Sequence, residues 1–196
     1  MSEAYLFGWA QPDAPPAKLF EEMRVRPAWV EEIYWVGDGA PHSGFEVPLL
    51  RLPPGPAARA LALRAAISAL RLEDRALILV GGDGPTLLLG GPATVGLRNL
   101  PPQARLQVLP LRAGAPVWES AARLAADRLP EGRQVTLVAA GGELPPGWEP
   151  VFDAARPLPF APLTAVVEAL ESSRPAAAVW LDEPDGGASC FLVERL

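Results

Sequence analysis

The order of regular segments in this chain repeats once, and the repeat limits the folds that the chain can adopt. Residues 56–89 predict a helix that opens on proline, an apolar strand, an acidic glycine turn and a second strand. Residues 162–194 predict the same segments in the same order. A strand–helix–strand unit implies parallel strands, whereas a strand that follows only a tight turn runs antiparallel to its predecessor. Each half is therefore expected to form a mixed sheet covered by helices.

The chain contains 24 prolines, which end helices and central strands but are tolerated at helix starts and in loops. The predicted strands are 4–8, 30–36, 47–52, 76–80 and 86–89 in the first half, and 105–111, 134–139, 151–153, 176–181 and 188–194 in the second. The predicted helices are 16–23, 56–70, 117–129 and 162–171. The Gly- and Pro-rich residues 90–102 are expected to connect two halves, 1–100 and 101–196, within one compact unit.

Composition narrows the class of protein. A chain of 196 residues that is 49% hydrophobic can bury a sizeable core. A net charge of −6 and the lack of a Lys/Arg cluster argue against a nucleic-acid partner, because phosphate backbones are bound through basic surfaces. Lys18 is the only lysine and Asn99 the only asparagine, a usage that suits a GC-rich genome and predicts a thermophilic source.

The first residues of the chain bear on its cellular location, and its few cysteine and histidine residues bear on disulfides and metal sites. Residues 1–4 contain no positive segment ahead of an apolar stretch, and no run approaches the roughly 18 apolar residues that a membrane span needs. We therefore expect a cytoplasmic protein without a membrane partner. Cys190 is the only cysteine and His42 the only histidine, so neither an internal disulfide nor a zinc site is expected.

Three segments, taken together in their order, resemble the thiolase superfamily, which includes the ketoacyl synthases. They are VEEIYWVG, LALRAAISALRLEDRALILVGGDG and the ending AAAVWLDEPDGGASCFLVERL. They are similar to an early strand, to the helix and strand after the nucleophile, and to the last hairpin of that superfamily. The resemblance implies an α/β fold of two duplicated halves. Each would be a mixed five-stranded sheet with its last strand antiparallel, and the halves would pack as a five-layer α-β-α-β-α sandwich.

The sequence departs from this superfamily where its catalytic residues would lie. The resemblance places the nucleophilic cysteine at the start of the helix 56–70, but residues 52–56 read Leu-Pro-Pro-Gly-Pro. The catalytic histidine would fall near 155–158, which read Ala-Arg-Pro-Leu, and the second cysteine near 180–183, which contain no thiol. The loop domain that helps thiolases hold coenzyme A has no room in a chain of this length. We therefore predict no catalytic residues of the family type, and no Claisen chemistry of the kind that this superfamily performs.

Three other groups of residues could suggest chemistry. His42 lies near Asp38 and Ser43, a combination found in hydrolases, but the sequence has no nucleophile elbow and a solvated loop is expected. Cys190 lies in an apolar strand, which predicts an unreactive core residue. The acidic residues at 182–185 could bind a divalent cation, although such turns are usually only solvated. No metal or catalytic site is predicted from them.

The turn Gly81, Gly82, Asp83 and Gly84 carries the main alternative. It resembles the GGDG signature of NAD kinases and lipid kinases, in which glycine amides approach phosphates. Here Pro85 and an apolar run follow, in place of a helix whose N-terminus could face a phosphate. Gly and Asp also supply the positive φ angles of hairpin turns, so a hairpin is favoured. These residues remain the candidate cofactor-binding site of the alternative hypothesis.

Two functional hypotheses follow. The first is a non-catalytic thiolase-like protein, needing no cofactor, that acts as a structural or regulatory subunit in acyl-thioester metabolism. It would form a homodimer, or a heteromer with a thiolase or ketosynthase, through the apolar strand from Val47 to Leu52. The second is a nucleotide-binding protein or kinase that uses the turn from Gly81 to Gly84. A weaker third hypothesis is residual binding of acyl-CoA between the halves.

Overall fold

A computed structural model describes residues 3–10, 14, 16–39, 41, 45–54, 58–70, 76–82, 84–95, 100–109, 117–129, 136–140, 149–150, 176–182 and 188–196. The predicted helix 162–171 and the predicted strand 151–153 lie outside these residues. His42, Asp83 and the expected histidine position 155–158 lie outside them as well. Within the described residues the chain is a mixed α/β protein in which strands predominate.

Ten strands are described: β1 (Glu3–Ala10), β2 (Val30–Val36), β3 (Leu49–Leu52), β4 (Leu77–Gly82), β5 (Gly84–Gly90), β6 (Ala104–Leu109), β7 (Thr136–Ala140), β8 (Glu149–Pro150), β9 (Ala176–Asp182) and β10 (Ala188–Arg195). The described helices are α1 (Pro16–Met23), α2 (Ala58–Ala69), α3 (Pro92–Val95) and α4 (Val117–Arg128), with a 3₁₀ turn at Pro27–Trp29. Among these helices, none is long and apolar enough to cross a membrane.

All these strands belong to one sheet in the order β3-β2-β4-β5-β1-β6-β10-β9-β7-β8. Strand β2 pairs in parallel with β3 and β4, and β7 pairs in parallel with β8 and β9. The hairpins β4–β5 and β9–β10 are antiparallel, as are the pairs β1–β5 and β6–β10. The sequence predicted five-stranded sheets, but the structure joins the two groups of five through the antiparallel pair β1–β6.

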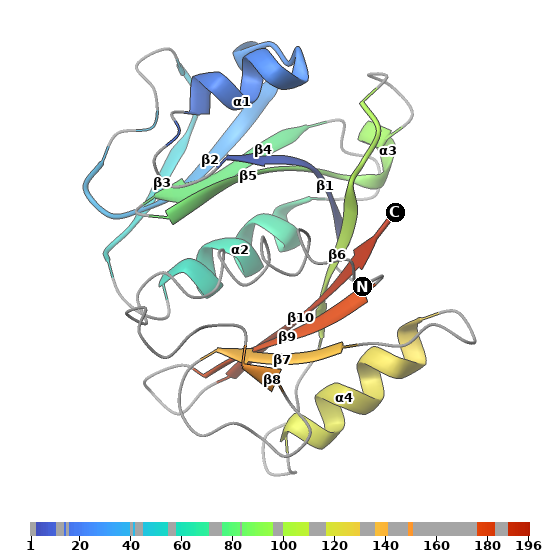
Figure 1. The fold of residues 1–196 in the computed structure, drawn as a ribbon. Helices are drawn as coiled ribbons and strands as arrows, with labels where there is room; N and C mark the ends of the chain where they lie inside the picture. Colours follow the sequence, from blue (N-terminus) through green and yellow to red (C-terminus); the bar gives the residue numbers. More distant parts are fainter. Residues whose placement is uncertain are drawn as a thin grey trace.

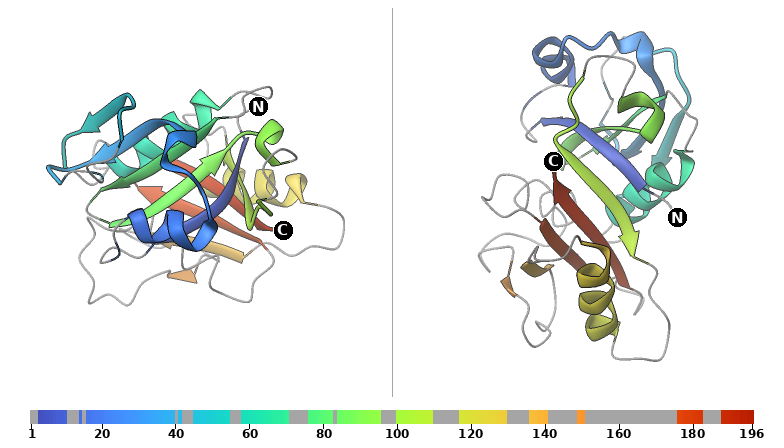
Figure 2. Two further views of the ribbon diagram at one scale, coloured as in Figure 1. Left: turned by 90° about the horizontal axis from the view of Figure 1, so that it is seen from above. Right: turned by 90° about the vertical axis from the view of Figure 1, so that its right-hand side faces the viewer.

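The sheet bends around helix α2 (Figure 1). Strands β1–β5 lie on one side of this helix and strands β7, β9 and β10 lie on the other. Helix α1 covers the outer face of the first group, and α4 covers the outer face of the second group, as the side view in Figure 2 also shows. Helices thus lie outside each arm of the sheet and between the arms.

Helix α2 is apolar on most of its circumference because it packs against both arms. Its side chains Leu63, Ala66 and Ile67 are fully buried. They share one core with Val80 of β4 and Phe191 of β10. Alanine, the best helix former, lets the strands approach this helix closely. A helix covered on two sides keeps only a narrow exposed stripe, which here holds Leu61, Arg64 and Ser68.

Several predicted boundaries change in the structure. The strand predicted at 47–52 is shorter in the structure, where it begins at Leu49. Pro48, just before it, has no N–H to donate to a neighbouring strand. Its carbonyl still accepts a hydrogen bond from the Ile33 amide at 3.0 Å. The short helix α3 lies in the segment predicted to be an irregular connection. The hairpin β4–β5 retains more strand than predicted, since Gly81, Gly82 and Gly84 belong to the strands and not to the turn.

Candidate functional site

The edge strand β3 is the most distinctive exposed feature of the described residues. Among the described strands it ends the sheet and pairs only with β2, in a register that sets Leu49 beside Ile33 and Leu50 beside Tyr34. Leu49 is 39% exposed and Leu50 is 51% exposed. Successive side chains of a strand point to opposite faces, so these leucines leave apolar surface open on both sides of one edge. A strand laid alongside β3 would cover both.

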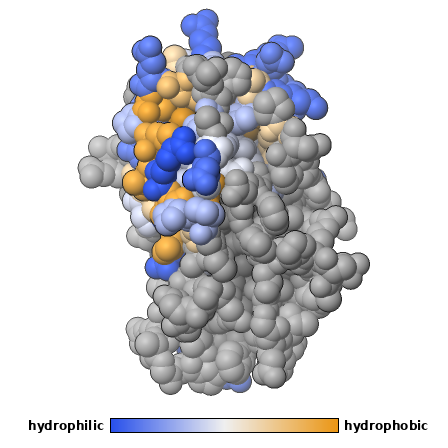
Figure 3. All heavy atoms as spheres, turned by 90° about the vertical axis from the view of Figure 1, so that its left-hand side faces the viewer, coloured by the Kyte–Doolittle hydropathy of each residue, from blue (hydrophilic) through white to orange (hydrophobic). Residues whose placement is uncertain are grey.

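The charged residue of this strand, Arg51, contacts the backbone of its own chain. The Arg51 guanidinium donates to the carbonyl oxygens of Gly37, at 3.5 Å, and Asp38, at 3.2 Å. These carbonyls lie just after β2, so the side chain holds the loop that leaves the sheet. Figure 3 views the molecule from this side, where apolar atoms lie next to strongly hydrophilic ones. The edge is thus apolar, with charged residues of both signs, Asp38, Glu46 and Arg51, exposed beside it.

Prolines limit the length of this edge. Pro48 precedes β3, and Pro53 and Pro54 follow it. Proline cannot donate to a neighbouring strand, and natural proteins use it to shorten sheet edges that would otherwise aggregate. A strand of four residues between such prolines is therefore protected against open-ended strand addition.

The start of α2 is where the thiolase resemblance would place a nucleophile. The residues described next to it are Leu52, Pro53 and Pro54 before the helix and Ala58 at its first position. None of these side chains can act as a nucleophile or transfer a proton. Residues 55–57 lie outside the described part of the chain, and their identities, Gly-Pro-Ala, also offer no nucleophile.

Cys190 lies on β10, opposite Trp180 of β9, and is fully buried. Burial raises the pKa of its thiol well above the ordinary range, because the thiolate would lose its hydration. It packs with Leu109, Ala125 and Leu192 beneath α4. The environment agrees with the expectation of an unreactive core thiol.

Close contacts with neighbouring strands explain why glycine occupies positions 81 and 82, which belong to the candidate nucleotide site. A Cβ on Gly82, whose φ is 143°, would lie 2.0 Å from the Val36 carbonyl oxygen. A Cβ on Gly81 would lie 2.8 Å from both Thr86 Oγ1 and Trp35 Cζ3. Gly82 also faces Gly84 across the hairpin. The glycines let β4 approach β2 and β5, and the segment that follows them is a strand, not a helix.

Other candidate residues of the sequence do not form a cluster. Asp182 ends β9, and residues 183–185 lie outside the described chain. Among the described residues no group of three or more His, Cys, Asp or Glu side chains could hold a metal ion. Sequence reasoning missed a polar cluster in which Arg105 contacts Glu3 and Glu194, since these residues come together only through strand pairing.

Comparison with known proteins supports the fold and leaves the family open. No protein-family model matches the chain, and no curated protein matches it. Among solved structures, 23 chains match, one of which is ChlB3, described as an acyltransferase. Its TM-score is 0.57 at 13% sequence identity, and the alignment covers 94% of this chain and 85% of ChlB3. At this identity the likeness concerns the fold alone.

Proposed function

We propose that this chain is a non-catalytic thiolase-like subunit that assembles through the edge strand β3. The observation that carries the proposal is the exposure of Leu49 and Leu50 on opposite faces of this edge. Full burial of one leucine side chain contributes about 1.5–3 kcal/mol, so a strand that covers both gains substantially. Main-chain hydrogen bonds to the open edge of β3 would fix the register of the pair.

The thiolase-like part of the proposal rests on strand order. The first group of strands has the order β3-β2-β4-β5-β1, and the second has the order β8-β7-β9-β10-β6. Taken in chain order, the two groups pair in the same pattern and with the same directions. We interpret this match as duplication of two halves, 1–100 and 101–196, in a five-layer α-β-α-β-α arrangement with α2 in the central layer. The structural likeness to ChlB3 extends over 94% of this chain, which supports one fold that spans both groups of strands.

The non-catalytic part of the proposal rests on side chains. A nucleophilic cysteine at a helix start is activated by the helix dipole and by neighbouring bases. Proline and leucine occupy the approach to α2, and the single thiol of the chain is in the core beneath α4. Incubation with an acetyl thioester should therefore add no acyl group to the protein, as read by intact mass. A stable acetyl adduct on the native protein would contradict this part.

A cross-linking experiment tests the assembly. Leu50→Cys puts a thiol on the edge, while Cys190 remains buried and unreactive. If β3 strands of two copies pair, mild oxidation should give a covalent dimer from Leu50→Cys. Leu61→Cys serves as the control, because Leu61 is 43% exposed but belongs to α2 and not to the edge strand. A heteromer would instead give the cross-link only when a thiolase or ketosynthase partner that carries a cysteine on the strand facing β3 is added. Absence of any cross-link specific to Leu50→Cys would contradict the proposal.

The nucleotide hypothesis remains as the alternative, with Gly81, Gly82, Asp83 and Gly84 as its residues. Their packing against Val36 and Trp35 accounts for the glycines without a phosphate. A fair test uses Asp83→Ala, because a side chain at Gly82 would disturb the sheet. Saturable binding of ATP or NAD that Asp83→Ala removes would favour this alternative. Residual acyl-CoA binding would appear separately, as thermal stabilisation by coenzyme A.

A further inference from the structure

The hydrogen bonds between β2 and β3 show which backbone groups of β3 are already used. The Ile33 amide donates to the Pro48 carbonyl at 3.0 Å, and the Gly37 amide donates to the Leu52 carbonyl at 3.1 Å. Backbone groups of alternate residues in a strand face the same neighbour. The even-numbered residues of β3 therefore direct their N–H and C=O groups at β2.

The odd-numbered residues Leu49 and Arg51 direct their backbone groups away from β2, at the open edge of the sheet. Each of them offers one donor and one acceptor there. The missing N–H of Pro48 faces β2 and takes nothing from the open edge. Beyond the strand, Pro53 has no N–H to offer at this edge. The pairing capacity of the open edge is thus confined to Leu49 and Arg51.

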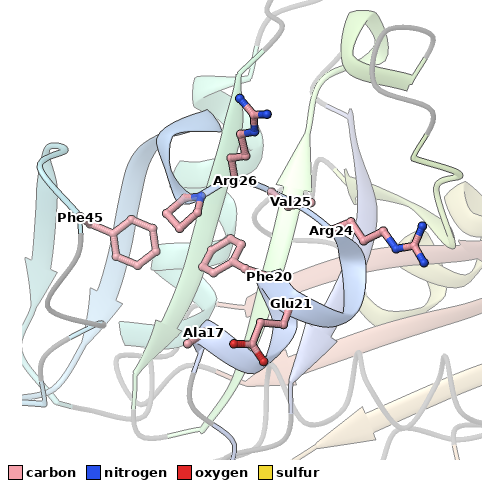
Figure 4. A pocket seen from close by; sticks show the side chains of 8 residues that line it. Ala17, Phe20, Glu21, Arg24, Val25, Arg26 and Phe45 are labelled. Carbon is pink, nitrogen blue, oxygen red and sulfur yellow. The ribbon is translucent and has the colours of Figure 1, made fainter.

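Side-chain contacts on both sides of β3 hold this edge in place. Before the strand, Phe45 meets Phe20 of α1 edge to face, with ring centroids 5.4 Å apart and an interplanar angle of 62° (Figure 4). Within the strand, the Arg51 guanidinium donates to the carbonyls of Gly37 and Asp38. A partner strand would therefore meet an edge that is already ordered, which lowers the entropic cost of pairing.

We propose that the partner at this edge is a second copy of the chain, and that the two β3 strands pair antiparallel about a two-fold axis at Leu50. This inference rests on the proposed function and deepens it. Leu49 then lies opposite the partner's Arg51, and Arg51 lies opposite the partner's Leu49. Each opposed pair exchanges both of its main-chain hydrogen bonds. The arrangement uses every outward donor and acceptor of β3.

Two other two-fold registers oppose outward residues, and both lose contacts. An axis at Arg51 sets two arginines opposite each other, and sets Leu49 opposite the partner's Pro53, which cannot donate. An axis at Leu49 pairs Arg51 with the partner's Val47, which lies outside the strand. The axis at Leu50 alone keeps all the hydrogen bonds within the four residues of β3.

The side chains favour the same register. Leu50 is 51% exposed and lies beside Tyr34, which belongs to the core around α2. Leu52, on the same face of β3, packs against that core. Contact between Leu50 and the partner's Leu50 therefore continues the core of each copy across the axis. On the other face, Leu49 covers the aliphatic stem of the partner's Arg51, and no like charges are opposed.

The far end of the described sheet favours a closed pair over head-to-tail growth. Strand β8 at that end has only two residues, Glu149–Pro150, and proline cannot donate to a neighbour. It offers no edge that matches β3 in length. Two-fold pairing of β3 with itself uses the same surface on both copies and closes the assembly at a dimer.

Disulfides that depend on register test this arrangement in the full chain. Leu49→Cys, Leu50→Cys and Arg51→Cys are oxidised mildly, alone and as mixtures after subunit exchange, and intact mass reads the products. Leu50→Cys alone should give a covalent dimer, because its Cα lies about 4.5 Å from that of its copy, within the roughly 4.4–6.8 Å that a disulfide spans. Leu49→Cys and Arg51→Cys alone should give none, because each is two residues out of register with its copy, roughly 7–8 Å away. A mixture of these two variants should give the mixed disulfide.

Two controls accompany these variants. The natural chain should give no covalent dimer, because its single thiol, Cys190, is fully buried. Arg51→Ser combined with Leu50→Cys should keep the cross-link, which shows that the edge persists without the contacts of Arg51 to Gly37 and Asp38.

The outcomes separate this inference from the proposed function. If Leu49→Cys or Arg51→Cys alone cross-links as readily as Leu50→Cys, the register is wrong, while assembly through β3 stands. If Leu50→Cys cross-links only to a different protein, the second copy is the wrong partner, and the proposed function again stands. If no variant cross-links, alone, mixed or with an added partner, the inference and the proposed function are both wrong.

Discussion

Arg105 of β6 and Glu194 of β10 lie directly opposite each other, and the guanidinium donates from Nε to the Glu194 Oε2 at 3.0 Å and from a second nitrogen to the same oxygen. Glu194 is 4% exposed. Another nitrogen of Arg105 lies 3.9 Å from the carboxylate of Glu3 on β1. Arg105 therefore contacts both neighbouring strands at the place where the two groups of the sheet join. This arrangement helps fix the register of β1, β6 and β10.

The substitution Glu194→Gln should destabilise the fold by about 2 kcal/mol, because it removes a charge-assisted contact and leaves Arg105 half-buried beside a neutral partner. Chemical denaturation followed by circular dichroism measures the change. Glu31→Gln, an exposed carboxylate on β2, is the control and should change stability by less than about 0.5 kcal/mol. Equal effects of the two substitutions would show that the pair is not stabilising.

The substitution Gly82→Ala should cost about 3 kcal/mol or more, because the new Cβ would meet the Val36 carbonyl oxygen and the φ of 143° disfavours any side chain. Gly39→Ala is the matched control: its Cβ would have ordinary contact with Trp35, 3.7 Å away, and its φ is not in the left-handed region. Thermal unfolding of both variants checks this. A Gly82→Ala protein as stable as Gly39→Ala would contradict the packing reason given for the glycine.

The phenol of Tyr34 should titrate far above the ordinary range. Burial first, and then its hydrogen bond to the Glu32 carboxylate at 2.9 Å, raise its pKa from 10.0 to about 12. Since the folded pKa is the higher one, this group stabilises the fold fully below pH 10, and the contribution is lost as pH rises from about 10 to 12.

Tyrosinate absorbance measures this titration in a Tyr5→Phe background, which leaves Tyr34 as the only tyrosine. Glu32→Gln should lower the midpoint, because the neutral phenol loses its carboxylate partner. A midpoint near 10 in the folded protein would contradict the burial of this side chain.

The thiol of Cys190 should resist modification in the native state at neutral and mildly alkaline pH, because burial raises its pKa and closes access to the sulfur. Labelling with a thiol-specific disulfide reagent should reach completion only after the protein is unfolded in guanidinium. Leu50→Cys, with its exposed thiol, is the positive control under native conditions. Rapid labelling of the natural chain would show that this strand opens readily.

The sequence predicted local elements well where their ends carry clear signals. The helix 16–23 is confirmed with both boundaries, because prolines precede it and the chain turns at Arg24. The antiparallel glycine hairpin is also confirmed, since a short turn between two apolar runs permits little else. Helix α3 could not be foreseen, because four residues give no periodic pattern.

Features that depend on distant contacts escaped prediction. Arg105 and Glu194 are 89 positions apart and meet only through the register of β6 and β10. A cavity beside α1 is lined by residues of that helix and by Phe45, which follows β2. Because these residues are distant in the chain, no short sequence motif predicts the cavity. The exposure of Leu50 likewise depends on β3 being at the end of the sheet, which its apolar sequence alone does not reveal.

Sedimentation velocity of the natural chain and of Leu50→Lys tests the central claim most directly, because the claim concerns assembly through the β3 edge. The natural chain should sediment as a dimer, alone or with a thiolase-like partner, and Leu50→Lys should sediment as a monomer in both cases. Leu61→Lys, which changes a leucine of α2 that is 43% exposed where Leu50 is 51% exposed, should retain the dimer. A natural chain that remains monomeric at high concentration and with every such partner, or a dimer that Leu50→Lys leaves intact, would contradict the account.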